Sequence, residues 1–123
     1  DGDATRVIRT DNSLATDVYA LDNPTGATGT IQSVTVYCRA RRTQNQGDVQ
    51  LVIYMGGSEY RGTTRTLTGS YTNYSQTWTT KPIGGSWGWA DITNLQAGVR
   101  MSGQNINFPA YCTQVWVEVV YEN

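Results

Sequence analysis

Apolar and polar residues alternate with a period of two along much of this chain, and that pattern predicts β-strands. In Thr30–Arg41 the apolar positions are Val34, Val36, Cys38 and Ala40. In Val49–Met55 they are Val49, Leu51, Ile53 and Met55. The polar segment Arg42–Asp48 separates the two runs, so the sequence predicts that they pair as a β-hairpin.

Other runs of the same kind predict further strands, because Gly and Pro residues separate them. They cover Ala4–Arg9, Thr16–Leu21, Tyr71–Thr80 and Ala110–Glu122, with short strands or bends at Gly56–Gly62 and Thr63–Gly69. In the last run Val115, Val117, Val119 and Tyr121 alternate with Gln114, Trp116 and Glu118.

The stretch Gly84–Val99 breaks this pattern. Trp89, Ile92 and Leu95 recur every three residues, which is typical of one face of a short helix. We therefore predict a helix at Trp89–Gln96 that ends at Gly98, with Trp89 in the core. Trp87 lies outside the helical stripe, and the pattern leaves both a packed and an exposed position open for it.

Seven or eight strands with one short helix predict a single all-β domain over residues 1–123. We expect an antiparallel β-sandwich, jelly-roll-like, with the helix near residues 89–96. The residues expected to line the core are Val34, Val36, Leu51, Ile53, Val115, Val117 and Val119.

Composition narrows the range of functions. Charged residues make up 15% of the chain against roughly 25% in typical domains, and the net charge is −1, so we expect no nucleic-acid partner. No run of 18 apolar residues is present, so we expect no membrane span. The sequence has no histidine, which removes Ser-His-Asp and Cys-His arrangements. We therefore predict no enzyme, no cofactor and no metal site. A calcium site at Asp1 and Asp3 is a minor alternative to a solvated terminus.

The chain has two cysteines, Cys38 and Cys112, which we predict to form a disulfide. Cys38 lies on the apolar face of its strand, whereas Cys112 has the parity of Gln114 and Trp116. Both thiols can point inward only if a bulge shifts the register between Cys112 and Val115. The alternative is a pair of buried thiols.

A group of aromatic and planar polar side chains has the parity of the outer sheet surface. The candidate interface or ligand-binding residues are Tyr37, Arg39, Tyr54, Gln114, Trp116 and Glu118, with Arg41 and Gln50 beside them. Tyr, Trp and Arg are enriched in protein interfaces, and stacking aromatics with polar neighbours also suit a sugar. The third interpretation is scattered surface aromatics, which strands commonly carry.

Five stretches occur in order along nearly the whole chain: "DGDATRV", "TIQSVTVYCRARR", "LTGSYTNYSQTWTTKP", "WGWADITNLQAGV" and "YCTQVWVEVVY". Together they resemble small jelly-roll modules of phage virion proteins and secreted prokaryotic surface proteins. The resemblance implies a β-sandwich in a virion, fibre or cell-surface assembly, and it carries no catalytic residues.

Two functions follow as expectations. The first is a non-catalytic structural or interaction module of a virion or extracellular assembly, which binds copies of itself or other virion or surface proteins. In a variant of this hypothesis, the amino-terminal strand within Asp1–Arg9 adds to a neighbouring copy. The second is a carbohydrate-binding module, which uses surface Trp and Tyr rings to bind glycans. Either function places the protein outside the cell or on a virion surface.

Overall fold

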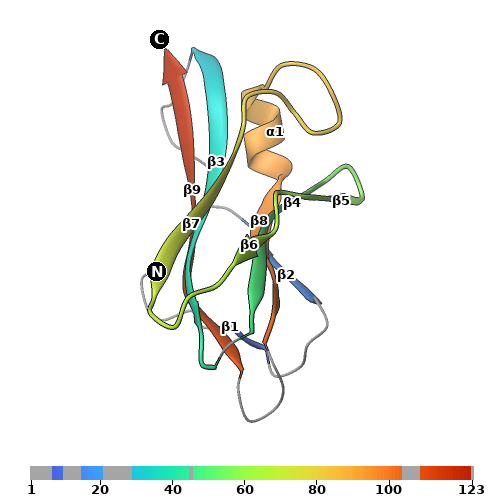
Figure 1. Ribbon diagram of the computed structural model, residues 1–123. Coiled ribbons are helices and arrows are strands. Elements are labelled where there is room, and N and C mark those ends of the chain that lie inside the picture. Colours follow the sequence, from blue (N-terminus) through green and yellow to red (C-terminus); the bar gives the residue numbers. More distant parts are fainter. Residues whose placement is uncertain (1–6, 10–14, 21–28, 45, 104–108, 123) are drawn as a thin grey trace.

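The computed structural model describes residues 7–9, 15–20, 29–44, 46–103 and 109–122 (Figure 1). Its strands are β1 (Val7–Arg9), β2 (Ala15–Ala20), β3 (Thr30–Arg42), β4 (Asp48–Met55), β5 (Ser58–Arg61), β6 (Arg65–Thr66), β7 (Thr72–Trp78), β8 (Gln96–Ser102) and β9 (Ala110–Glu122). One helix, α1 (Trp89–Asn94), precedes β8.

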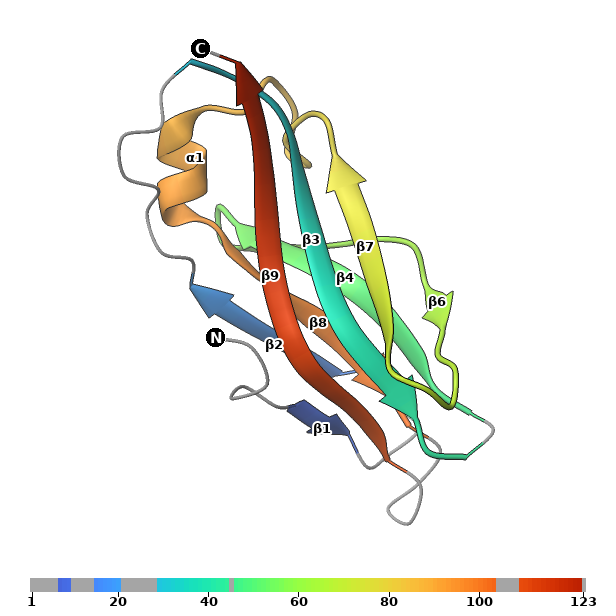
Figure 2. The ribbon, with the colours of Figure 1, turned by 90° about the vertical axis from the view of Figure 1, so that its left-hand side faces the viewer.

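The strands form two antiparallel sheets packed face to face. The front sheet has the order β1-β9-β3-β7, and Figure 2 views the molecule onto its outer side. The back sheet has the order β2-β8-β4-β5, with β6 also paired to β4. The helix lies at the end of the sandwich where β9 terminates (Figures 1 and 2). The predicted all-β antiparallel sandwich with one short helix is confirmed.

The hairpin predicted from Thr30–Met55 is wrong. β3 pairs with β9 and β7 in the front sheet, whereas β4 pairs with β8, β5 and β6 in the back sheet. The polar segment between them therefore crosses from one sheet to the other. Alternation shows that each strand has one buried face, but two strands can bury those faces against each other across a sandwich instead of side by side.

The predicted bulge in β9 is confirmed. Ala40 is opposite Cys112 and Arg39 is opposite Gln114, so Thr113 is the extra residue on β9. A second register shift lies near the other end of β3, where Gln32 is the extra residue between Ile31 and Ser33. The bulge turns Cys112 into the core while Gln114, two residues later, faces outward.

The core lies between the sheets. Val34, Val36, Leu51 and Ile53 are fully buried, as predicted. Val115, Val117 and Val119 pack against this core but are only partly buried. Residues from the β7–α1 region close the core, among them Trp78, Trp87, Ile92 and Leu95.

The helix is shorter than predicted, and its proposed end at Gly98 is wrong. It begins after Gly88, whose N–H donates to the Asp91 carboxylate at 2.8 Å. It ends at Asn94, with Leu95 as the C-cap, and Gly98 lies inside β8. The three-residue spacing of Trp89, Ile92 and Leu95 marked the helix correctly. The alternation of β8 begins only two residues beyond Asn94, which shortens the segment that a helix can take.

The two tryptophans of this segment have different positions. Trp87 is buried, and its Nε1 donates to the carbonyl oxygen of Trp78 at 2.9 Å. Trp89 is half-buried against the core and meets Tyr121 edge to face. Its Nε1 donates to the carbonyl oxygen of Gly29 at 3.0 Å. The indole N–H groups of both tryptophans thus have partners within the domain, and both rings belong to the core or pack against it.

Candidate binding face

The outer side of the front sheet brings together five of the six predicted site residues. Tyr37 and Arg39 come from β3, and Gln114, Trp116 and Glu118 come from β9. Tyr37 is directly opposite Trp116, Arg39 is opposite Gln114, and Glu118 is opposite Thr35. We call this surface the front face. On β3 and β9 it also includes Arg41, Tyr111 and Val120, and on the β7 side Tyr71, Asn73, Ser75 and Thr77.

The centre of the front face is an aromatic pair. The rings of Tyr37 and Trp116 stack with centroids 5.1 Å apart and planes 3° apart. Both side chains are half-buried. Rings that stack on one another each cover one face of the other, so they do not form the wide coplanar platform expected of a sugar-binding groove. The pair is instead a raised apolar contact point on a polar sheet.

Glu118 is next to this pair. The Tyr37 hydroxyl donates to the Glu118 carboxylate at 3.3 Å. Burial raises the pKa of Tyr37, and the Glu118 charge and this hydrogen bond raise it further. Tyr37 therefore stays neutral over the physiological range.

Two arginines form the other end of the front face. The guanidinium groups of Arg39 and Arg41 lie 5.7 and 5.4 Å from the ring centroid of Tyr71. Arg41 also lies 5.5 Å from the ring centroid of Tyr111. Aromatic rings on two sides hold this cation in place without neutralising its charge.

The hydrogen bonds of these arginines go to neutral oxygens. Arg39 donates to the side-chain oxygen of Asn73 at 3.3 Å, and Arg41 to the carbonyl oxygen of Gly69 at 3.4 Å. The Nε of Arg41 is buried and has no hydrogen-bond partner. Neither arginine forms an ion pair in the described part of the chain. The front face thus carries two positive charges that no carboxylate of the described residues neutralises.

Sequence reasoning missed Tyr71 and Tyr111 as members of this site. Tyr111 has the parity of Arg41 only because of the bulge at Thr113, and that bulge was predicted for Cys112 without its effect on Tyr111. Tyr71 precedes β7, and its position beside Arg41 depends on the β3–β7 pairing. That pairing joins strands about 30 residues apart, and the sequence pattern does not reveal it.

Tyr54 and Gln50 do not belong to the front face, and their predicted grouping with it is wrong. Both are on β4, in the back sheet, and they face the opposite side of the molecule. The error follows from the wrong hairpin, which placed β4 beside β3. Tyr54 is 38% exposed and is opposite Glu59 of β5.

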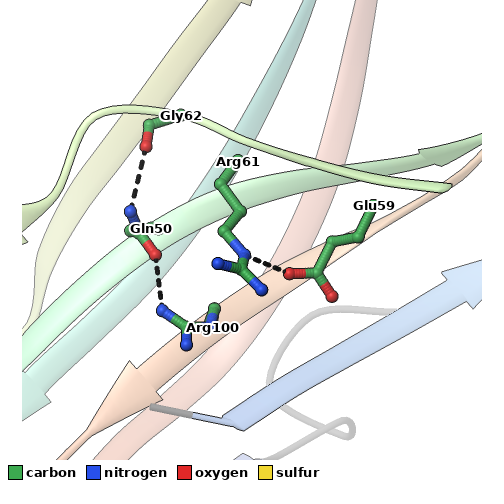
Figure 3. A network of polar contacts seen from close by, with 5 residues as sticks. All are labelled: Gln50, Glu59, Arg61, Gly62 and Arg100. Atoms are coloured by element: carbon green, nitrogen blue, oxygen red, sulfur yellow. Dashed lines mark hydrogen bonds and ion pairs between the residues drawn. The ribbon is translucent and has the colours of Figure 1, made fainter.

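The outer side of the back sheet, which we call the back face, carries a polar network instead (Figure 3). Arg100 donates to the Gln50 side-chain oxygen at 3.1 Å, and the Gln50 amide donates to the Gly62 carbonyl at 3.3 Å. Arg61 forms an ion pair with Glu59. Four polar side chains of this face, those of Gln50, Glu59, Arg61 and Arg100, thus take part in three contacts with one another or with the Gly62 carbonyl.

The two cysteines come together in the core, as predicted, but no disulfide joins them. Cys38 is opposite Val115 and Cys112 is opposite Ala40, so the cysteines are diagonal neighbours and not a facing pair. A hydrogen bond with Cys112 and burial both raise the pKa of Cys38. The Cys112 thiol donates to the carbonyl of Gln114 at 3.3 Å. The raised pKa keeps Cys38 a protonated thiol.

Metal ligands do not cluster in the residues that the structure describes: no three of the His, Cys, Asp and Glu side chains there are placed to hold an ion. The Asp1 and Asp3 alternative lies outside the described residues. No helix in the same residues is long and apolar enough to cross a membrane.

Comparison with known proteins finds no family model that matches the chain. No curated protein matches it either. Function must therefore be argued from the two outer faces.

Proposed function

We propose that this protein is a non-catalytic structural or interaction module of an extracellular or virion assembly, and that the front face is its contact surface. The observation that carries the proposal is the Tyr37–Trp116 stack beside Arg39 and Arg41, whose charges no carboxylate of the described chain neutralises. Aromatic rings and arginines at the centre of a surface are the residues that dominate binding energy in protein interfaces. The partners are copies of this chain or other virion or surface proteins.

We also propose that the sandwich is a jelly roll, and the strand order supports this topology. The pairings β1–β9, β2–β8, β3–β7 and β4–β5 are nested, with the first strand beside the last and each next strand beside the next to last. A long two-stranded ribbon rolled into two sheets gives this arrangement, which is the topology of a jelly roll. We propose the same location for this domain as for the modules that it resembles, on a virion or a cell surface.

The proposal is tested by sedimentation velocity over a wide range of protein concentration. Trp116→Ala is expected to weaken association by about tenfold or more, because the stacked pair is the apolar centre of the surface. Tyr54→Ala is the matched control, since it removes an exposed aromatic from the back face. Equal association of wild type and Trp116→Ala would contradict the proposal.

Carbohydrate binding is the alternative function. Gln114, Arg39 and Asn73 offer planar polar groups beside the aromatic pair, as sugar sites do. The stacked geometry supports it less well, because only the outward faces of the two rings remain for a sugar. Quenching or enhancement of Trp116 fluorescence by members of a glycan panel, absent in Trp116→Phe, would favour this function over assembly.

A further inference from the structure

The front face is organised in rows that run across the strands. The central row contains Trp116, Tyr37 and Ser75. On one side of it follow Gln114, Arg39 and Asn73, and then Tyr111 and Arg41. On the other side follow Glu118, Thr35 and Thr77, and then Val120 and Ser33. Neighbouring rows are about 7 Å apart, since each is two residues further along the strands.

Charge is distributed unequally about the central row. Arg39 and Arg41 lie on one side of the Tyr37–Trp116 pair, and Glu118 lies on the other, with Glu122 further along β9. Arg39 and Glu118 are each one row away from the pair. The front face is therefore complementary to itself when its row order is reversed.

A second copy can face this surface about any two-fold axis that runs parallel to the sheet, such as one along the strands or one across them. With the axis along the strands between β3 and β9, each row meets the same row, so Arg39 faces Gln114 of the other copy and lies beside its Arg39, and Glu118 likewise lies beside Glu118. With the axis across the strands at the central row, Arg39 faces Thr35 of the other copy and lies one strand away from its Glu118. Like-charge contacts across an interface cost several kcal/mol, so the second arrangement is strongly preferred.

We propose that two copies of this chain bind face to face through the front face, about a two-fold axis that crosses the strands at the Tyr37–Trp116 pair. Arg39 of each copy then pairs with Glu118 of the other, and the row of Tyr111 and Arg41 covers Val120. This inference rests on the proposed function and adds to it the partner, the symmetry and the charge register.

The occupant is a second copy because one surface supplies both halves of the complementarity. A C2 interface requires the same patch on both partners, with each contact made twice. Five rows over three strands span roughly 30 by 15 Å, less than the roughly 800 Å² per partner of a standard interface. The isolated dimer is therefore a weak one, and its equilibrium is measured from micromolar to millimolar protein.

Sedimentation equilibrium of charge-reversed variants tests whether Arg39 of one copy pairs with Glu118 of the other. Arg39→Glu and Glu118→Arg, each alone, place like charges together at two symmetric contacts. Each is expected to weaken self-association by about tenfold or more. An equimolar mixture of the two variants is expected to form a heterodimer of near wild-type affinity, because both contacts are then of opposite charge. The double variant is expected to recover self-association for the same reason.

The recovery separates contacts between copies from effects within one copy. The single variants lose the hydrogen bonds to Asn73 and from Tyr37, and both bonds are lost in the double variant as well. The matched control is Glu59→Arg with Arg61→Glu on the back face, singly and together, which is expected to leave association unchanged. Circular dichroism and urea midpoints establish that each variant is folded.

The outcomes distinguish this inference from the proposed function. If Trp116→Ala weakens association but mixing the charge variants restores nothing, the two-fold register is overturned and the contact surface stands. If the wild type is monomeric at every concentration, self-association is overturned. A glycan response that requires Trp116 in that monomer would then replace assembly as the function.

Discussion

The front and back faces are both outer sides of antiparallel sheets, yet their polar groups are used differently. On the back face, Arg61 meets Glu59 and Arg100 meets Gln50, so both arginines have partners on the same face. On the front face, Arg39 and Arg41 lie against aromatic rings, and the Glu118 carboxylate accepts from a tyrosine. The back face thus contains an ion pair, whereas none of the ion pairs among the described residues involves Arg39, Arg41 or Glu118.

The two faces also differ in how far the outward-pointing residues at their centres are buried. Val52 has the outward parity of β4, between Leu51 and Ile53 of the core, yet it is fully buried. Its neighbours across the strands are Arg61 of β5 and Gly98 of β8. The corresponding centre of the front face, Tyr37 and Trp116, is half-exposed. The centre of the back face is thus covered by its own sheet, although Tyr54 near one end of β4 is 38% exposed, whereas the aromatic pair at the centre of the front face is only partly covered.

The largest expected effect comes from placing a charge at the buried centre of the back face. Val52→Asp places a carboxylate at a fully buried position without a partner, and we expect a loss of about 4 kcal/mol or more in the free energy of unfolding, or no folded protein. Urea unfolding followed by fluorescence measures this loss. Ser75→Asp is the matched change beside Tyr37 on the front face, and it is expected to cost about 1 kcal/mol or less. Equal losses at both positions would contradict the distinction between the faces.

Removing one member of the back-face network has a smaller effect. Gln50→Ala takes away the acceptor of Arg100 and the donor to Gly62, so we expect about 1–2 kcal/mol of destabilisation in urea unfolding. Asn73→Ala removes the acceptor of Arg39 on the front face, where the guanidinium still meets the Tyr71 ring and solvent. It is expected to cost less. A reversed order would show that the front-face contacts are the structural ones.

The ion pair of the back face gives a smaller effect still. Arg61 and Glu59 have side chains 50% and 24% exposed, so solvent and salt screen their attraction. Glu59→Gln is expected to change the free energy of unfolding by about 0.5 kcal/mol, and less at high salt. Thermal unfolding at two ionic strengths measures the change. A salt-independent loss above about 2 kcal/mol would contradict the screened pair.

The smallest effect is a titration on the front face. The pKa of Tyr37 is raised in the folded protein, so the folded state binds the phenol proton more tightly than the unfolded state does. The contribution of Tyr37 to the free energy of unfolding is therefore lost as pH rises above about 10. Glu118→Gln removes the charge that opposes the phenolate. The Tyr37 signal, identified by difference from Tyr37→Phe, is then expected to titrate at lower pH. An unchanged or higher titration midpoint would contradict the contact.

The sequence predicted the strands, the helix and the bulge because each depends on the alternation or spacing of residues that are close together in the chain. Cys112 carried the wrong parity for its strand, and only a register shift could turn it inward together with Cys38. The sequence pattern could not predict which strands pair within a sheet, since β3 pairs with strands that begin about 40 and 80 residues after it along the chain. The front face could therefore be predicted for Tyr37 and Trp116 but not for Tyr71, and Tyr54 was placed on the wrong sheet.

The two bulges of the β3–β9 pair have a consequence for insertions and deletions. Gln32 and Thr113 each occupy a place that the opposite strand does not match. Loss of Thr113 would leave Cys112 inward and Gln114 outward, in regular alternation, and loss of Gln32 would do the same for Ile31 and Ser33. Loss of Val36 would instead move one stretch of β3 to the opposite face. A one-residue gap at Gln32 or Thr113 in a homologous chain would therefore preserve both faces of the front sheet.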